Sequence, residues 1–563
     1  ERIRMMERFF DAHRRWMIEP YPRYEELRRR REGIPSAEAV RLFNEGDLRD
    51  LQVWFNLTWL DPIFQQEDAF VKQLIAKGRG FTEREKLQLL DKHREVLAKV
   101  IPIHRELAQS GQIELTTSAF YHPILPLLCD TNVARECMPE AVLPRRFRHP
   151  EDARVQIERG LSYFESVFGF RPRGLWPSEG SVSQEALTLV AESGIGWVAT
   201  DEGILGRTLG RPVGRNAQGD VLEPEMLYRP WRVEESGRQL QIVFRDHAMS
   251  DQIGFHYQRF QPGHAVDDFM GKVEAIGRAT GGNAGRRPTL LTIVLDGENC
   301  WEYYQNGGVD FLRGLYRRIA QHARITPVRI GDYLEQYPAT DKINHLFPGS
   351  WIQHNFGIWI GHPECNRAWD LLYDTRQFLV DMQGGDGKTP EQIARAWREL
   401  YIAEGSDWFW WFGDSHTSAQ DSLFDRLFRK HLQNVYLALG EQPPSELARP
   451  ISQGHGQLLH TQPTGLLNVK VNGRRTYFEW INAGHCACTG ARGAMTMVHE
   501  GLIENLYFGF DLDRLVVRLD ARNGPFRERL ADVDQIRLFF FQPEGFELLI
   551  DNPSHKRPTT RLY

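Results

Sequence analysis

Two short segments place a carboxylate directly after an apolar run and close to a tryptophan. Residues 174–181 read GLWPSEGS, in which a proline stops regular strand pairing just before Glu179. Residues 290–301 read LLTIVLDGENCW, in which a run of apolar and β-branched residues ends at Asp296. Two such carboxyl groups suit glycoside hydrolysis, because one attacks the anomeric carbon or activates water while the other protonates the leaving oxygen. Each segment taken alone also fits a helix cap or a tight turn.

Two further segments carry polar side chains at the ends of predicted strands. Residues 111–123 (GQIELTTSAFYHP) hold Glu114 inside an apolar run and His122 after it. Residues 243–255 (VFRDHAMSDQIGF) end a strand pattern in an Arg-Asp pair that contains Asp246. An Arg-Asp pair at a strand end is often structural, so this segment has both a binding and a structural interpretation.

A third group of candidates is aromatic. Residues 403–413 (AEGSDWFWWFG) set Asp407 beside an unbroken run of Trp and Phe that includes Trp410. Trp176 and Trp301 likewise lie within five residues of a carboxylate. Flat indole faces stack on sugar rings, whereas the same side chains also fill hydrophobic cores. We expect at least two of these three tryptophans to face the substrate.

The elements that would position these residues alternate between strand and helix. From about residue 111 to 335, short apolar runs separate helical segments such as 151–168 and 183–193. This alternation predicts parallel βα units, in which the chemistry lies where strands end and loops begin. The expected strands are 113–118, 174–176, 197–200, 242–245 and 290–295.

The flanking regions have other patterns. Residues 1–110 are charged and helical in period, and residues 336–443 return to helix. After the Pro443-Pro444 pair the pattern becomes β, with an Asn472-Gly473 turn that predicts a hairpin over residues 468–480. Further strands are expected at 515–519 and 536–541.

Composition excludes several classes of protein. The chain of 563 residues has 69 Lys and Arg against 75 Asp and Glu, a net charge of −6, which argues against a dedicated nucleic-acid binder. Its longest apolar runs are too short to span a bilayer. Six cysteines are too few for a disulfide scaffold and indicate a reducing compartment, so we expect a cytoplasmic protein.

These motifs together resemble those of glycoside hydrolase family 57, and most closely its amylopullulanase-like members. The family's second to fifth characteristic regions match GQIEL at 111–115, WPSEG at 176–180, LDGENCW at 295–301 and AEGSDWFWW at 403–411. The resemblance implies a retaining α-glucan hydrolase in which Glu179 is the nucleophile and Asp296 the general acid/base. The substrate-binding residues that we infer beside them are Glu114, His122, Trp176, Asp246, Trp301, Asp407 and Trp410.

The resemblance also implies the architecture. We expect an α/β fold consisting of an incomplete (β/α)7 barrel over residues 1–335 with a helical insertion at about 1–110. A helical region over 336–443 would complete the cleft, and a truncated β-sandwich would occupy 444–563. The family opens with a His-Gln-Pro region that has no match here, so we expect a fragment that lacks the first barrel strand and an active-site His, and whether it is active alone stays open.

Other functions remain open at this stage. The same carboxylates would serve a 4-α-glucanotransferase or a branching enzyme. A non-catalytic glucan-binding protein fits the missing first region, and a metal-dependent polysaccharide hydrolase would need a His/Asp cluster. Asp246-His247 offers ligands for such a cluster without evident partners. We therefore predict no metal and no cofactor, and an α-glucan as the partner.

Overall fold

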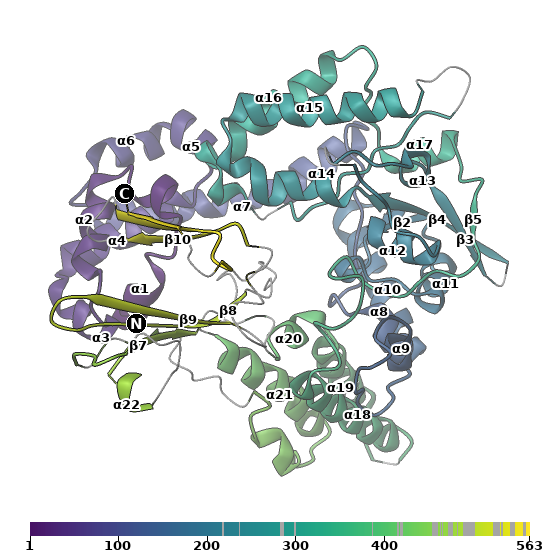
Figure 1. Cartoon of the computed structure of the whole chain (residues 1–563). Coiled ribbons are helices and arrows are strands. Elements are labelled where there is room, and N and C mark those ends of the chain that lie inside the picture. Colours follow the sequence, from purple (N-terminus) through teal and green to yellow (C-terminus); the bar gives the residue numbers. More distant parts are fainter. Residues whose placement is uncertain are drawn as a thin grey trace. The chain divides into compact units, whose positions relative to one another are not determined.

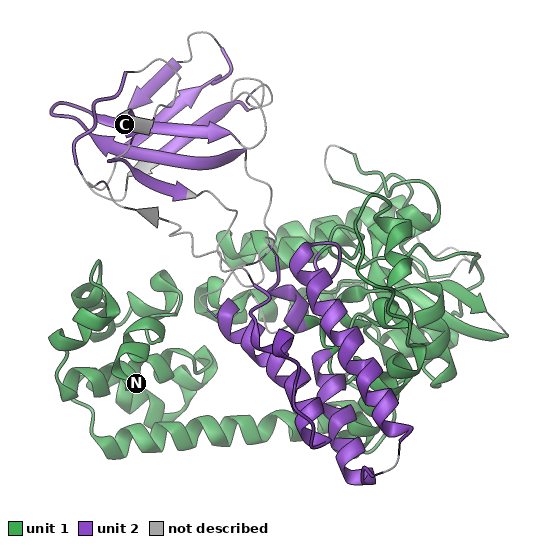
Figure 2. Ribbon diagram, turned by 90° about the horizontal axis from the view of Figure 1, so that it is seen from below, with its two compact units in different colours: residues 1–357, 404–406 green, residues 358–403, 407–563 purple. Residues whose placement is uncertain are grey.

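A computed structural model of the chain divides into two compact units, Glu1–Gly357 with Glu404–Ser406, and Ile358–Ala403 with Asp407–Tyr563 (Figure 2). The structure describes residues 1–452 apart from 217–218, 236, 282–286, 298–299, 386, 414–415 and 417–419. Beyond these it describes 460–461, 463, 465–470, 477–480, 482–487, 502–521, 530, 533–540, 546–555 and 559–562.

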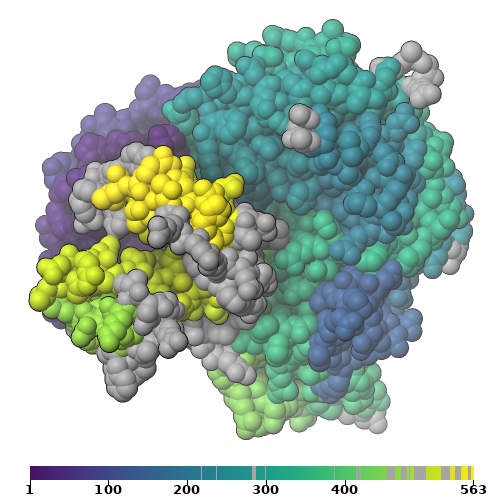
Figure 3. Space-filling view, viewed as in Figure 1, coloured from purple at the N-terminus to yellow at the C-terminus, as the bar shows by residue number. Residues whose placement is uncertain are grey.

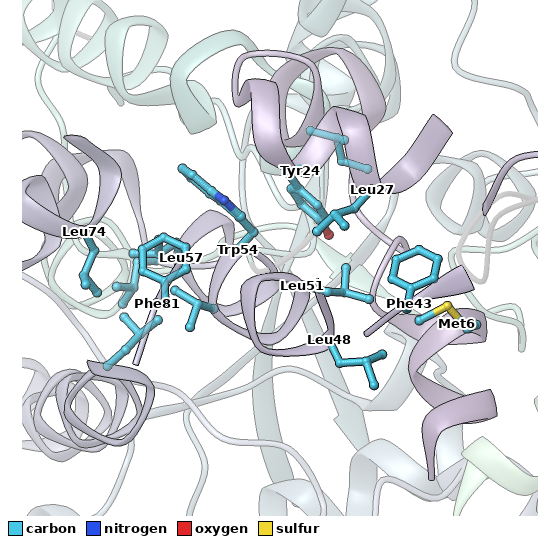
Figure 4. Close-up of a cluster of buried hydrophobic side chains, with 14 of the residues drawn as sticks. Met6, Tyr24, Leu27, Phe43, Leu48, Leu51, Trp54, Leu57, Leu74 and Phe81 are labelled. Atoms are coloured by element: carbon cyan, nitrogen blue, oxygen red, sulfur yellow. The ribbon is translucent and has the colours of Figure 1, made fainter. Parts of the chain in front are cut away.

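The first unit begins with a cluster of helices that has its own hydrophobic core. Trp54, Tyr24 and Phe81 are almost fully buried in it (Figure 4). Inside the same cluster the guanidinium of Arg23 pairs with Asp47 at 2.6 Å and with Asp50 at 2.9 Å. The helices are α1 Arg2–Arg8, α2 Pro22–Arg31, α3 Ser36–Ala39, α4 Glu45–Thr58, α5 Pro62–Glu67, α6 Ala69–Lys77 and α7 Glu83–Gln109.

A mixed sheet forms the centre of the first unit. Its strand order is β1-β2-β4-β3-β5, and every pairing is parallel except the antiparallel β3–β4 pair. The expected strands at 174–176, 197–200 and 242–245 are therefore confirmed. The strands are β1 Gly174–Leu175, β2 Trp197–Asp201, β3 Trp231–Glu235, β4 Arg238–Arg245 and β5 Lys342–Ile343.

Helices pack around this sheet as the alternating pattern predicted. Helix α11 contacts β3 and β4, and α12 contacts β2 and β4 (Figure 1). Figure 3 shows the surface of this region, coloured from blue to teal. The helices are α8 Leu125–Cys129, α9 Ala134–Cys137, α10 Pro150–Phe168, α11 Gln184–Glu192, α12 Glu202–Thr208, α13 Pro224–Leu227, α14 His247–Asp251, α15 Pro262–Ala279, α16 Val309–Gln321 and α17 Ile330–Gln336.

Two of the expected strands do not form. Residues 113–118 contribute a single parallel bridge, between Thr117 and Leu175, and residues 290–295 contain no strand. The second segment is extended, but its neighbours change along its length: Leu290 bonds to Tyr228 and the Thr292 carbonyl accepts from Asp246. An apolar run supports a strand only where one partner continues alongside it, and sequence does not reveal that continuity.

The second unit starts with helices and continues into two antiparallel sheets. The sheets have the orders β6-β7-β8-β9 and β10-β11-β12. The predicted strands at 515–519 and 536–541 correspond to β9 and β10. The predicted hairpin over 468–480 is wrong at its end, where helix α22 forms, and its Asn472-Gly473 turn lies outside the described residues. The elements are α18 Pro363–Gln383, α19 Pro390–Ala403, α20 Ser406–Trp410, α21 Asp421–Ala438, β6 His460–Thr461, α22 Tyr477–Trp480, β7 Gly484–Ala487, β8 Ile503–Phe510, β9 Leu515–Ala521, β10 Gln535–Phe540, β11 Phe546–Asp551 and β12 Thr559–Leu562. Among the described residues, no helix is long and apolar enough to cross a bilayer.

Candidate active site

A cavity of about 840 Å³ in the first unit collects residues from the predicted motifs. Glu114, His122, Trp176 and Asp296 all line it. They come from three separate segments of the chain, 111–123, 174–181 and 290–301. Trp197, Trp351 and Ile330 also line the cavity, together with apolar residues of α7 and α10.

Glu179 lies beside this cavity on a sharp turn at the end of β1. The turn spans Ser178–Gly180, and Glu179 itself has a left-handed backbone conformation with φ of 56°. Gly180 also has positive φ, and a β-carbon there would come within 3.0 Å of the Trp176 ring. A non-glycine residue in this conformation is strained and is held only where its surroundings fix it. The turn thus sets the direction of the Glu179 carboxylate.

Trp351 provides that fixation. Its indole nitrogen donates to Oε2 of Glu179 at 3.0 Å, and its backbone nitrogen donates to the Glu179 carbonyl at 3.1 Å. The Trp351 ring meets Trp176 edge-to-face at 5.2 Å, and the Arg245 guanidinium lies 5.1 Å from its centre. Sequence reasoning missed Trp351, because it lies 172 positions from Glu179 and no carboxylate flanks it.

Asp296 reaches the cavity from the extended segment 290–295. The backbone nitrogen of Val294 donates a hydrogen bond to Oγ of Ser250 at 3.2 Å, which ties this segment to α14. The aspartate is half-buried and lines the cavity. Its neighbours Glu298 and Asn299, part of the same motif, lie outside the described residues.

Glu114 also lines the cavity, but its carboxylate is engaged within the protein. It accepts from the backbone nitrogen of Gly331 at 2.7 Å, from Arg173 Nε at 3.1 Å and from Trp197 Nε1 at 3.2 Å. These bonds join α17, β2 and the loop before β1. Glu114 therefore supports the wall of the cavity in this structure.

His122 contacts residues 404–406, a short segment that belongs to the first unit. Its Nδ1 lies 2.9 Å from Oγ of Ser406, and the Ser406 backbone nitrogen donates to the His122 carbonyl at 3.0 Å. His122 has a positive φ of 56°. Like Glu179, it is a polar residue at a strained turn beside the cavity.

Asp246 and Trp301 do not line this cavity. Asp246 is fully buried, and its carboxylate accepts from the Tyr228 hydroxyl at 2.8 Å, from Arg215 at 2.9 Å and from Met249 N at 2.8 Å. Burial raises the pKa of Tyr228, so this phenol stays a donor. The structural interpretation of the Arg-Asp region accounts for these contacts. Trp301 donates to the Gly297 carbonyl at 2.6 Å.

Asp407 and Trp410 belong to the second unit. Asp407 is exposed, and Trp410 stacks on His416 with ring centres 3.8 Å apart. Burial lowers the pKa of His416 to about 4, so its ring is neutral at pH 7. Phe409 is buried and Trp411 stacks on Phe424. Packing within this unit therefore uses more of the aromatic run than the sequence suggested.

Comparisons with known proteins agree with the motifs. The profile of glycosyl hydrolase family 57 matches residues 7–344. The chain is 23% identical to a 1,4-alpha-glucan branching enzyme of Thermococcus kodakarensis over 54% of this chain and 50% of that protein. It is also 23% identical to a 4-alpha-glucanotransferase of the same organism, over 44% of this chain and 32% of that protein. The chain thus spans half or less of the length of these curated relatives.

A solved structure resembles the fold. The crystal structure of the family 57 branching enzyme from Thermococcus kodakaraensis, in complex with glucose, aligns with a TM-score of 0.51 at 18% identity. The alignment covers 72% of this chain and 82% of that one. The profile match extends over more than half of the chain and includes β1 to β5. The chain belongs to glycosyl hydrolase family 57.

Proposed function

We propose that the protein is a retaining α-glucan-active enzyme that cleaves α-1,4 or α-1,6 glucosidic bonds by double displacement. The observation that carries the proposal is the placement of Glu179, held by Trp351, next to a cavity that Asp296 and Trp176 line. The relatives support the substrate class, since those named above act on α-glucans or are named for transfer between them.

In this mechanism Glu179 attacks the anomeric carbon while Asp296 donates its proton to the departing glycosidic oxygen. The first half-reaction leaves a glycosyl ester on Glu179 and an ionised Asp296. Asp296 then removes a proton from the incoming hydroxyl, which attacks the same carbon and frees Glu179. Two carboxyl groups suffice for this sequence, so the chemistry needs no metal and no cofactor. We expect their carboxyl carbons to lie roughly 5–5.5 Å apart in the substrate complex.

The acceptor in the second step separates hydrolysis from transfer. Water gives an amylopullulanase-like hydrolase, and a glucan hydroxyl gives a 4-α-glucanotransferase or branching enzyme. The cavity is lined by Trp176, Trp197, Trp351 and Phe164, which offer apolar faces for sugar rings. Such faces serve an acceptor sugar as well as a donor, and two of the relatives are named for transfer.

The test replaces each carboxylate in the full-length protein. Glu179→Gln and Asp296→Asn should each lower kcat on amylose or pullulan by more than about 10³-fold, with glucan binding retained, because they remove bond making rather than contacts. Glu67→Gln, on an exposed residue of α5, is the matched control and should keep full activity.

Two outcomes separate the rival functions. If the unaltered protein binds glucan but does not turn it over, it is a binding protein. Turnover that survives Glu179→Gln but is lost on chelation and restored by zinc would indicate a metal-dependent hydrolase.

A further inference from the structure

A second polar cluster lies at the end of β2, where Asp201 is 3.5 Å from the guanidinium of Arg245. It consists of Asp201, His247 and His354, which are far apart in sequence and are brought together by β2, α14 and the loop after β5. One ligand atom from each residue lies within 4.8 Å of the others. Oδ2 of Asp201 is 2.9 Å from Nδ1 of His247, and its Oδ1 is 3.0 Å from Nε2 of His354.

The cluster combines a buried carboxylate with two accessible imidazoles. Asp201 is fully buried, whereas the side chains of His247 and His354 are 36% and 30% exposed. All three line a cavity of about 520 Å³, so solvent and ions reach the imidazole side. This cavity shares none of its lining residues with the one beside Glu179.

His247 carries the second contact that metal-bound histidines commonly have. Its Nε2 lies 3.0 Å from Oδ2 of Asp251, while its Nδ1 faces Asp201. A carboxylate on the far nitrogen fixes the tautomer and ring orientation of a histidine ligand and increases its basicity. Asp251 in turn pairs with Arg245 at 2.6 Å, which holds its carboxylate in place.

The backbone around His354 is shaped to keep its ring in this position. His354 and Gln353 both have left-handed conformations, with φ of 57° and 52°. Residue 203, at the start of α12, is a glycine, and a β-carbon there would lie 2.0 Å from Nε2 of His354. Strained backbone and a close glycine contact both concentrate at positions where the structure must present a particular side chain.

From this geometry we propose that Asp201, His247 and His354 form a binding site for one divalent transition-metal ion, with Zn²⁺ as the best fit. Two imidazoles and one carboxylate suit zinc and its first-row neighbours, whereas Ca²⁺ and Mg²⁺ prefer oxygen ligands throughout. Zinc bonds of about 2.0–2.2 Å set tetrahedral ligand atoms roughly 3.3 Å apart, and one ligand atom from each of the three residues already lies within 4.8 Å of the others. Water from the cavity supplies the fourth ligand.

The role of the ion is structural. It replaces the proton on Nδ1 of His247, which leaves to solvent, while Nε2 of His247 keeps its proton and donates it to Oδ2 of Asp251. His354 binds through Nε2, with its proton on Nδ1. Arg245, which lies 3.5 Å from Asp201, stacks on Trp351, so the ion fixes one side of the wall that holds Glu179. The site does not depend on the proposed glucan chemistry, because none of its ligands takes part in it.

Zinc titration of the metal-stripped full chain, with a chromophoric chelator as competitor, tests the site. We expect one zinc ion per chain and a melting temperature that rises with added zinc. His354→Ala should lower zinc affinity by more than about 100-fold, and Asp251→Asn by about 10–100-fold, because it removes only the supporting carboxylate. His345→Ala is the matched control: His345 is 65% exposed and pairs with Glu136 at 2.6 Å, outside the cluster.

The Asp251→Asn variant keeps all three ligands, so it tests the site even if His354→Ala folds poorly. Calcium and magnesium should leave the melting temperature unchanged. Two results would overturn the proposal: the unaltered chain binds zinc no more tightly than His354→Ala, or His345→Ala loses as much zinc affinity as His354→Ala. Either result would leave a cluster held by hydrogen bonds alone.

Discussion

The hydrogen bond from Trp351 to Glu179 orients the carboxylate that we propose as the nucleophile. A hydrogen bond to a charged group contributes about 1.5–3 kcal/mol. Trp351→Phe keeps the aromatic ring against Trp176 but removes the donor, which lies 3.0 Å from Oε2. We expect kcat to fall about 10-fold or more with a smaller change in KM.

Trp397→Phe is the control for that substitution. The Trp397 indole donates to Gln383 at 2.8 Å on an exposed face of the second unit, so its loss should leave kcat unchanged. A Trp351→Phe variant with normal kcat and only a lower melting temperature would show that the contact serves packing rather than catalysis.

Glu114 gives a second prediction at the residue scale. Because its carboxylate accepts three protein hydrogen bonds, Glu114→Gln should lower the free energy of unfolding by about 1–3 kcal/mol. The matched control is Glu335→Gln, which removes another partner of Arg173 but is 71% exposed. It should cost less than about 1 kcal/mol in chemical denaturation. If Glu114→Gln melts normally and raises KM instead, the substrate contact inferred from sequence is the correct role.

At the scale of elements, the parallel pairing of β1 with β2 depends on a glycine. Gly174 pairs in register with Trp197, and a β-carbon on it would come within 2.2 Å of the indole ring. Trp197 lines the cavity and cannot shift without disturbing Glu114. Gly174→Ala should therefore destabilise the protein by about 1–3 kcal/mol through overpacking.

Gly196→Ala serves as the comparison, since its nearest neighbour is the Arg173 carbonyl at 3.6 Å. Its effect should stay within about 0.5 kcal/mol. Equal melting temperatures for the two variants would mean that the Trp197 ring moves aside freely.

The helices before residue 110 should be sensitive to acid. Hydrogen bonds from Arg28 lower the pKa of Glu25 from 4.5 to about 2. A carboxyl whose pKa is depressed on folding stabilises the fold above its ordinary pKa, and that stabilisation is lost as pH falls toward the depressed value. Thermal melts of Glu25→Gln and the unaltered protein should differ at pH 6 and converge as pH approaches 2. Glu32→Gln, on the exposed partner of Arg28, should follow the unaltered protein at every pH.

The sequence predicted elements better than it predicted their partners. Helices α10, α11, α18, α19 and α21 have clear apolar periods, and β2 and β4 are continuous apolar runs, so local pattern was sufficient for them. Residues 290–295 have an equally apolar run but no continuous partner. Asp246 was inferred to bind substrate, yet its buried carboxylate accepts hydrogen bonds from Arg215 and Tyr228.

The same limit applies to the site. Glu114, His122, Trp176 and Asp296 were identified because each lies in a recognisable motif, and all four line one cavity. Trp351 and His354 were missed, since their importance comes only from residues distant in sequence. Contacts between remote positions depend on the tertiary fold, which residue types and spacing do not specify.

For the whole molecule, the family profile ends at residue 344, whereas Asp407 and Trp410 lie in the second unit. The motif that contains them remains a prediction about substrate binding. The first unit alone supplies the two carboxylates and the aromatic cavity on which the proposed chemistry rests. We therefore propose that Glu179 forms a covalent bond to sugar during the reaction.

Covalent trapping tests that claim most directly. The full-length protein is incubated with a fluorinated α-glucosyl fluoride, which slows hydrolysis of the glycosyl-enzyme, and its peptides are mapped by mass spectrometry. We expect one sugar adduct per chain, on Glu179, and none in Glu179→Gln. An adduct on Asp296, or steady turnover of glucan with no adduct and inverted product configuration, would contradict it.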